Sequence, residues 1–175
     1  MKKIFILTVL LTGITISLMA QKATKSAYAE IGGAGLASIN YDMRLMKKED
    51  GLGFRVGVGY FAIRSDYSNG TNTSTNKIGA LTFPLELNYL LGKNEKNYFE
   101  LGAGATIVSI KNKSTDNIYV DNSDEIFNGT FGHLYLGYRL QPKDGGFLFR
   151  AGITPVFGKG FFIPYWAGVS FGYAF

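Results

Sequence analysis

Eight charged residues interrupt segments of this chain that otherwise alternate between apolar and small or polar residues. Half are carboxylates and half are arginines: Glu30, Asp42, Glu86, Glu100, Arg44, Arg55, Arg139 and Arg150. A guanidinium can bond a carboxylate through two parallel hydrogen bonds, so equal numbers of the two groups can satisfy one another where water is excluded. The chemistry that these residues predict is ion pairing in an enclosed space.

His133 is the single histidine, and catalysis would depend on it first. A nucleophilic mechanism of the lipase type needs a histidine beside a serine hydroxyl and a carboxylate. The residue two positions further along is Tyr135, and no serine stands at a matching position. We therefore predict no catalytic residues and no enzymatic activity.

Metal and cofactor sites are not expected either. The sequence has no cysteine and one histidine, so the usual zinc ligand sets are absent. A loop carries four acids, Asp116, Asp121, Asp124 and Glu125, but it lacks the glycine of an EF-hand loop. We interpret these acids as solvated loop residues.

Short strands are the elements that would position the charged residues. Eight segments alternate in polarity with period two and are separated by turn-rich sequence. Each has about the 9–11 residues that a tilted strand needs to cross a bilayer. An even number of such strands can close an antiparallel up-and-down barrel in which every backbone group is paired. The segments are 27–35, 36–46, 52–63, 78–91, 98–110, 130–141, 147–158 and 165–175.

The connections between these segments alternate in length. Tight polar turns are expected at 47–51, 92–97 and 142–146, and longer loops at 64–77 and 111–129. Outer-membrane barrels have short periplasmic turns and longer outer loops, and this pattern agrees if both chain ends are periplasmic. The remaining connections, near Gly35 and at 159–164, are short. Pro84 and Pro155 lie within segments and lack an N–H to donate, so we expect a bulge or local irregularity at each.

Alternation gives every segment one apolar face and one polar or small face. In the fourth segment Leu85 and Leu87 share one face, whereas Glu86 and Asn88 share the other. A soluble barrel of the lipocalin type would bury the apolar face, whereas a membrane barrel turns it toward lipid. Solvated strand faces normally carry lysine, and here every lysine after the leader is expected in the tail, a turn or a loop. We therefore predict apolar side chains outside and the charged residues inside.

Strand direction places all eight charged residues in one half of the barrel interior. Those on outward-running segments lie near the start of the segment, and those on returning segments lie near the end. Two interpretations stay open: a structural network that fills a small interior, or a proton- or ion-responsive plug beneath a shallow, outward-facing cavity. Eight strands leave no room for an open channel in either case. We take Glu86 as the partner of Arg139.

The last segment alternates an apolar, aromatic face with a face of mostly small residues. It resembles the C-terminal strand that directs outer-membrane proteins of Gram-negative bacteria to insertion. The resemblance implies an insertion signal and a contact with the insertion machinery. The residues of that signal are Tyr165, Val169, Phe171, Tyr173 and Phe175.

The first residues have the order of a signal peptide. Lys2 and Lys3 precede an apolar run that is too short to span a bilayer, and Ala20 is a small residue at the expected cleavage position. We expect residues 1–20 to be a signal peptide and residues 21–175 to form one β-barrel domain. The net charge of +5 is weak and scattered, so nucleic acid is not an expected partner.

Several motifs carry a resemblance to a known class of protein. They are Tyr28-Ala-Glu-Ile-Gly-Gly, Ser38-Ile-Asn-Tyr-Asp, Phe83-Pro-Leu-Glu-Leu-Asn-Tyr-Leu-Leu-Gly92 and Gly172-Tyr-Ala-Phe175. The chain resembles the small eight-stranded outer-membrane barrels of the OmpA-transmembrane-domain and OmpX type, in particular the porin-like barrels of Bacteroidetes. The resemblance implies a monomeric, multi-pass barrel in outer-membrane lipid with both termini periplasmic.

The resemblance does not fix the activity. We expect a non-enzymatic barrel with a side-chain-filled lumen that serves envelope integrity or surface contact through its outer loops. The alternatives are an accessory barrel of a secretion or gliding assembly and, less favoured, a lipid-modifying enzyme.

Overall fold

A single antiparallel sheet contains every strand of the structure, a computed structural model that describes residues 24–46, 48–69, 72–92, 96–114 and 129–175. No helix among these residues is long and apolar enough to cross a membrane. The strands are β1 (Lys25–Gly32), β2 (Leu36–Arg44), β3 (Gly51–Asn69), β4 (Asn72–Leu91), β5 (Asn97–Ser114), β6 (Gly129–Leu140), β7 (Gly146–Ile153), β8 (Val156–Gly158), β9 (Phe161–Ile163) and β10 (Ala167–Ala174).

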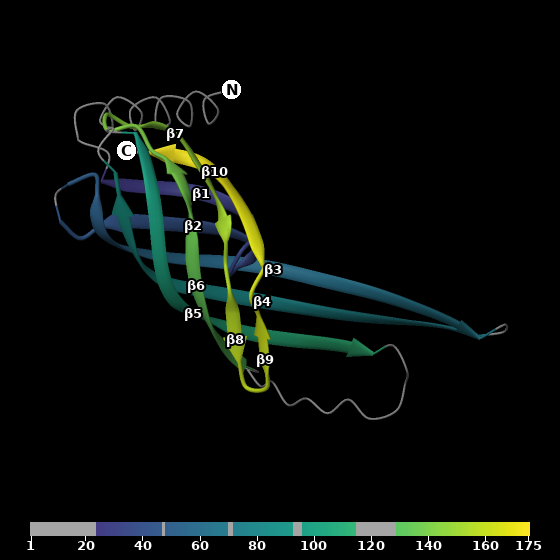
Figure 1. Cartoon of the computed structure of the whole chain (residues 1–175). Coiled ribbons are helices and arrows are strands. Elements are labelled where there is room, and N and C mark those ends of the chain that lie inside the picture. The colour runs from purple at the N-terminus through teal and green to yellow at the C-terminus, as the bar shows by residue number, and fades with distance from the viewer. Residues whose placement is uncertain (1–23, 47, 70–71, 93–95, 115–128) are drawn as a thin grey trace, which may run out of the picture.

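The sheet closes into a barrel, because each strand of the ring pairs with two neighbours. Strands β1 to β7 follow one another around the ring, β10 pairs with β7 and with β1, and β5 pairs with β6. The ring therefore has eight strands, and the predicted fold class is confirmed. Strands β8 and β9 form a hairpin beyond β7 (Figure 1).

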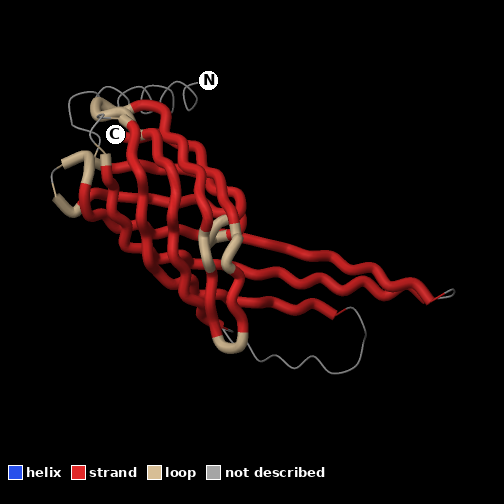
Figure 2. Tube along the Cα trace, viewed as in Figure 1, coloured by secondary structure: helices blue, strands red, loops and turns tan. Residues whose placement is uncertain are grey.

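The two ends of the barrel differ. At the end that we call the terminal end, β1 begins and β10 stops, and Lys25 and Phe175 exchange backbone hydrogen bonds of 3.0 and 2.8 Å. The opposite, distal end carries the β1–β2 turn at 33–35, the β3–β4 hairpin and the β8–β9 hairpin (Figure 1). Figure 2 shows β3, β4 and β5 continuing well past the rest of the ring at this end.

The distal extension corrects one prediction. We expected residues 64–77 to form a loop, but 64–69 and 72–77 continue the β3–β4 ladder as far as the pair Asn69↔Asn72. Residues 70 and 71 lie outside the described residues. The start of the second predicted loop, 111–114, is part of β5, and residues 115–128 lie outside the described part of the chain. Four lysines expected outside strands therefore belong to strand backbones: Lys25, Lys77, Lys111 and Lys113. Three of these four lie in the distal extension, and the expectation was wrong for all four.

Both prolines produce a local irregularity without a shift of register. Beside Pro84, the β3–β4 pairing is interrupted between Val56↔Leu85 and Gly59↔Thr82 and then resumes in the same register. At Pro155 the seventh predicted segment divides into β7 and β8, and pairing with β6 resumes at His133↔Val156. The expected irregularities are confirmed, and neither is a bulge.

The inner and outer faces follow the predicted alternation. Outer side chains such as Ile39, Leu87 and Phe171 are 69%, 53% and 50% exposed, and aromatic pairs such as Phe149–Phe171 lie on this face. Between the β1–β2 turn and the terminal end, the larger inner residues are buried, and most of them are polar or charged. The last strand starts later than predicted: Tyr165 and Trp166 precede β10, which begins at Ala167.

Candidate functional site

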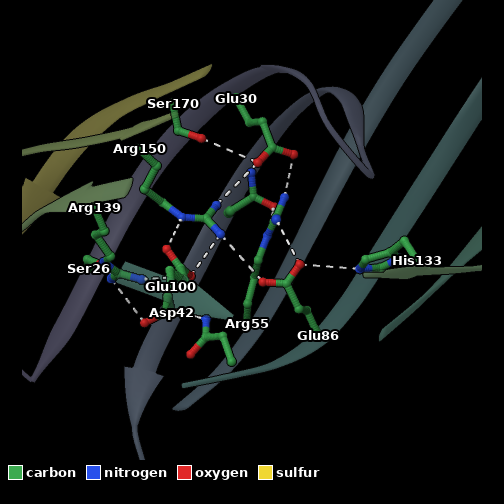
Figure 3. A network of polar contacts seen from close by, with 12 residues as sticks. Ser26, Glu30, Asp42, Arg55, Glu86, Glu100, His133, Arg139, Arg150 and Ser170 are labelled. Carbon is green, nitrogen blue, oxygen red and sulfur yellow. Dashed lines mark hydrogen bonds and ion pairs between the residues drawn. The ribbon is translucent and has the colours of Figure 1, made fainter. Parts of the chain in front are cut away.

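All eight charged residues that the sequence singles out lie inside the barrel and are at most 5% exposed. They come from β1 to β7, and Figure 3 shows seven of them, all but Arg44, with side chains pointing toward one another. Every one has an opposite charge within 4 Å. The geometry is a connected network rather than a set of separate pairs.

Arg150 is the centre of this network. Its Nε donates to Glu100 Oε2 at 2.8 Å, its Nη1 to Glu30 Oε2 at 3.2 Å, and its Nη2 to Glu86 Oε1 at 3.4 Å. A guanidinium offers five N–H donors in a planar fork, so one arginine can serve three carboxylates from three strands. Arg150 thereby ties β7 to β1, β4 and β5 across the lumen.

The other arginines extend the network toward the terminal end. Arg55 bonds Glu30 at 2.6 Å and Glu86 at 3.4 Å. Arg139 bonds Asp42 at 3.2 Å and Glu100 at 3.4 Å, so our choice of Glu86 as its partner was wrong. The other donors of the Arg139 guanidinium bond Gln141 Oε1 at 2.8 Å and Ser26 Oγ at 2.9 Å. Its cross-strand neighbour Arg150 is the residue that reaches Glu86.

Arg44 marks the terminal edge of the network. It donates to Asp42 and Asn88, each at 2.5 Å, and to the Gly51 carbonyl at 3.1 Å. Asn88 in turn donates to Asp42. Paired in this way, the buried charges avoid the large cost of an isolated ion in a medium of low dielectric constant.

Neutral residues that the sequence analysis did not assign to the network complete it. The guanidinium carbon of Arg150 lies over the rings of Tyr28 and Tyr135, 4.9 and 4.3 Å from their centres. Such cation–π contacts stabilise a desolvated arginine. Polar partners from the same inner faces are Ser26, Asn40, Asn88, Gln141 and Ser170. Inner-face parity, applied to every residue and not only to charged ones, would have identified them.

The β1–β2 turn closes the distal side of the network. Its three consecutive carbonyls accept hydrogen bonds from three separate segments of the barrel. The donors are Trp166 Nε1, before β10, to Gly33 at 2.8 Å; Thr106, in β5, to Ala34 at 3.1 Å; and Thr82, in β4, to Gly35 at 2.9 Å. Ala34 is only 1% exposed, so the turn folds into the barrel and not away from it. Sequence reasoning missed this, because a short Gly-rich turn does not reveal its direction.

The turn also rests on the network directly. A Cβ added to Gly33 would lie 2.6 Å from Glu30 Oε1, and the positive φ of 62° at Gly33 is a conformation that favours glycine. Gly33 of the turn therefore packs directly against the carboxylate of Glu30.

His133 has the neighbours that sequence analysis did not find. Its Nδ1 lies 3.4 Å from Thr106 Oγ1, and its Nε2 lies 3.3 Å from Glu86 Oε2. The order hydroxyl, imidazole, carboxylate matches that of a catalytic triad, but the Thr106 hydroxyl gives its one proton to the Ala34 carbonyl. All three side chains are at most 1% exposed. The arrangement links the turn to the charge network and offers no accessible nucleophile.

The residues predicted as an insertion signal lie at the outer surface of the closing strand. Val169, Phe171 and Tyr173 belong to β10 and are 39%, 50% and 49% exposed. Tyr165 is 85% exposed in the turn before the strand. Phe175 follows the strand, and its ring lies 6.5 Å from that of Tyr41. The acidic loop residues 116–125 lie outside the described residues.

The comparisons with known proteins bear on the fold. No family model matches the chain, and no curated protein matches it. Among solved structures, the chain is similar to the N-terminal β-barrel domain of Pseudomonas aeruginosa OprF, with 15% sequence identity and a TM-score of 0.53. The similarity covers 89% of this chain and 100% of that domain. At this identity it supports the closed eight-stranded barrel fold.

Proposed function

We propose that the chain is an integral outer-membrane β-barrel without catalytic activity, which inserts as a monomer and presents its distal end for surface contact. The single observation that carries this proposal is the reversed distribution of polarity. Charged side chains are buried in the interior, whereas leucine, isoleucine, phenylalanine and tyrosine side chains cover the outside. A water-soluble barrel would expose a large apolar area at high cost, whereas lipid accepts it without penalty.

The interior argues against a conducting pore. The charge network occupies the lumen of a narrow eight-stranded ring, and the β1–β2 turn covers its distal side. Barrels of this size have interiors that side chains fill. We therefore expect a role in envelope integrity or contact, and not solute passage.

The distal extension supports surface contact. Pairing of β2 with β3 ends at Ser38↔Gly59, whereas β3 continues to Asn69, so one edge of β3 has no strand partner among the described residues. A bare strand edge is a template for pairing with another chain. This edge also favours a second candidate function, an accessory barrel in a secretion or gliding assembly.

The proposal is tested by expressing the full chain in a Gram-negative host and following the membrane fractions. We expect the protein with the outer membrane, resistant to carbonate extraction, and migrating faster on electrophoresis when it is not boiled. Purified protein in planar bilayers should show no stable conductance. Recovery in the soluble fraction, with migration unaffected by boiling, would overturn the assignment. Capture of a specific envelope complex by the wild-type chain, lost when 64–77 is shortened, would favour the accessory role.

A further inference from the structure

The distal mouth of the barrel is lined by apolar side chains that face inward. The alternation that turns Arg55, Gly57 and Gly59 into the lumen also turns Phe61 toward the inner side of β3. Pairing with Val156, itself opposite His133, puts Ile163 on the inner face of the β8–β9 hairpin. The residues of this distal mouth are Phe61, Ala80, Val108, Phe131, Phe161 and Ile163.

These side chains are far more accessible than the interior below them. Phe61, Phe161 and Ile163 are 39%, 44% and 43% exposed, whereas Thr82 and Thr106 beneath them are at most 1% exposed. The Phe131 and Phe161 rings meet edge to face with centroids 6.4 Å apart, which joins β6 to β9 across the rim. Above the buried β1–β2 turn, the inner faces of β3, β6 and β9 therefore carry accessible apolar side chains.

The charge distribution indicates which ligand would fit. None of the six residues of the distal mouth is charged, and the charge network lies below the β1–β2 turn. Lys159 is exposed at the tip of the β8–β9 hairpin, on the rim. Apolar side chains with a cation at their edge are complementary to a hydrocarbon chain that ends in an anionic group.

The hairpin also makes the mouth continuous with the outer apolar surface. Phe157 and Phe162 pair with each other on the outer face of the hairpin and are 44% and 64% exposed. Phe161 and Ile163 lie on its inner face. Both faces of this hairpin therefore carry accessible apolar side chains. Transfer of each such contact from water is favourable in proportion to its apolar area.

We propose that the distal mouth binds the hydrocarbon chain of a single-chain anionic amphiphile, such as a fatty acid, with Lys159 near its carboxylate. The proposal rests on the proposed membrane location, because the outer surface supplies the ligand's route. The binding site is formed by the inner face of the β8–β9 hairpin, Phe131 and Phe61, over the β1–β2 turn that Trp166 and the threonines hold.

The only tryptophan of the sequence provides the test. Trp166 donates to the Gly33 carbonyl in the β1–β2 turn, directly beneath the mouth. Folded full-length protein in vesicles of unbrominated phosphatidylcholine is titrated with a dibrominated fatty acid, whose bromines quench tryptophan on close approach. We expect quenching that saturates and is reversed by the unbrominated fatty acid.

Two variants of one hairpin separate the mouth from bulk lipid. Phe161→Asn with Ile163→Asn alters the inner face, and Phe157→Asn with Phe162→Asn alters the outer face by the same chemistry. The inner variant should bind roughly tenfold more weakly or worse, because two apolar contacts are lost. The outer variant should retain saturable quenching.

Quenching that never saturates, or that is equal in both variants, would overturn the inferred site. Both variants are first checked for the folded form, which migrates faster on electrophoresis when the sample is not boiled. Lys159→Met leaves the apolar side chains intact and should weaken binding, because the carboxylate of the fatty acid loses its cation. The fold and membrane insertion have their own readout. Absence of saturable quenching in protein that is folded and inserted rejects the ligand site alone and leaves the proposed function standing.

Discussion

Neighbouring residues of β4 experience opposite surroundings. Leu85 and Leu87 are 36% and 53% exposed on the outside, whereas Glu86 between them is 1% exposed and touches Arg55 and Arg150. In a water-soluble protein the assignments would be reversed. The contrast shows that the two faces suit different media: the apolar outside suits hydrocarbon, and the inside suits an enclosed space where opposite charges pair.

The largest loss of stability is expected from removing Arg150, the centre of the charge network. Arg150→Met removes the partner of three carboxylates and leaves them buried without it. Removing one member of a buried ion pair typically costs about 3–5 kcal/mol. Urea-induced unfolding of the refolded barrel, monitored by loss of the fast-migrating form, measures this. Lys48→Met, at an exposed turn, is the matched control and should change little.

A second variant in the same network tests the pairing itself. In the Arg139→Met background, Glu100→Gln should recover part of the lost stability, because Arg139 contacts Glu100 and the remaining carboxylates and arginines still pair with one another. Glu86→Gln should recover none, since Glu86 pairs with Arg55 and Arg150 and not with Arg139. Equal recovery by both would mean that charge balance, and not specific contact, holds the network.

A charged side chain placed on the outer face should also lower the stability of the barrel. Leu85→Arg should cost about 2–4 kcal/mol if the side chain faces the middle of a bilayer. Leu85→Met conserves apolar character and volume, so it should cost less than about 1.5 kcal/mol. The same unfolding assay in lipid vesicles compares the two variants. An arginine that is tolerated as well as methionine would mean that this face does not contact hydrocarbon.

A smaller effect is expected where the interior is packed rather than charged. Gly152 pairs with Gly137, and a Cβ there would lie 2.5 Å from the Leu136 carbonyl and 2.9 Å from the Tyr135 ring. Gly152→Ala should therefore cost about 1–3 kcal/mol, the usual cost of overpacking. Gly129→Ala, whose added Cβ meets nothing within 4 Å, should be nearly neutral in the same assay.

A loss of stability similar to that of Gly152→Ala is expected from removing Phe175. Its backbone N–H and carbonyl each bond Lys25, so the deletion removes two hydrogen bonds, worth about 1 kcal/mol each. If the insertion machinery recognises the closing strand, the yield of the shortened chain in the outer membrane should nevertheless fall sharply. Unchanged yield in cells, with the expected small loss of stability, would reject the recognition role of Phe175.

The barrel fold was predictable because the facing of each strand and the need for an enclosed interior both follow from local sequence. Period-two alternation gives the facing of each strand, and the balance of carboxylates and arginines gives the need for an enclosed interior. Pairing within the network was not predictable, since a contact such as Arg150 with Glu30 depends on strand tilt and register. Inner-face parity alone would have added Tyr28 and Tyr135, but not their stacking on Arg150.

The parts that were missed depend on backbone geometry that one sequence does not specify. The direction of the β1–β2 turn follows from hydrogen bonds with Thr82, Thr106 and Trp166, which are distant in the sequence. Residues 64–77 are rich in Ser, Thr and Asn, a composition that suits loops and exposed strands alike. The hydroxyl–imidazole–carboxylate series at His133 likewise needed three strands to be placed before it could be seen.

The central claim, that the apolar face contacts lipid and the charges face inward, is tested most directly by a spin label at Leu136. The chain has no cysteine, so Leu136→Cys provides a unique attachment point on the outer face of β6. In reconstituted vesicles the label should collide frequently with oxygen, which concentrates in lipid, and rarely with a water-soluble nickel complex. Frequent collision with the nickel complex and protection from oxygen would contradict the account.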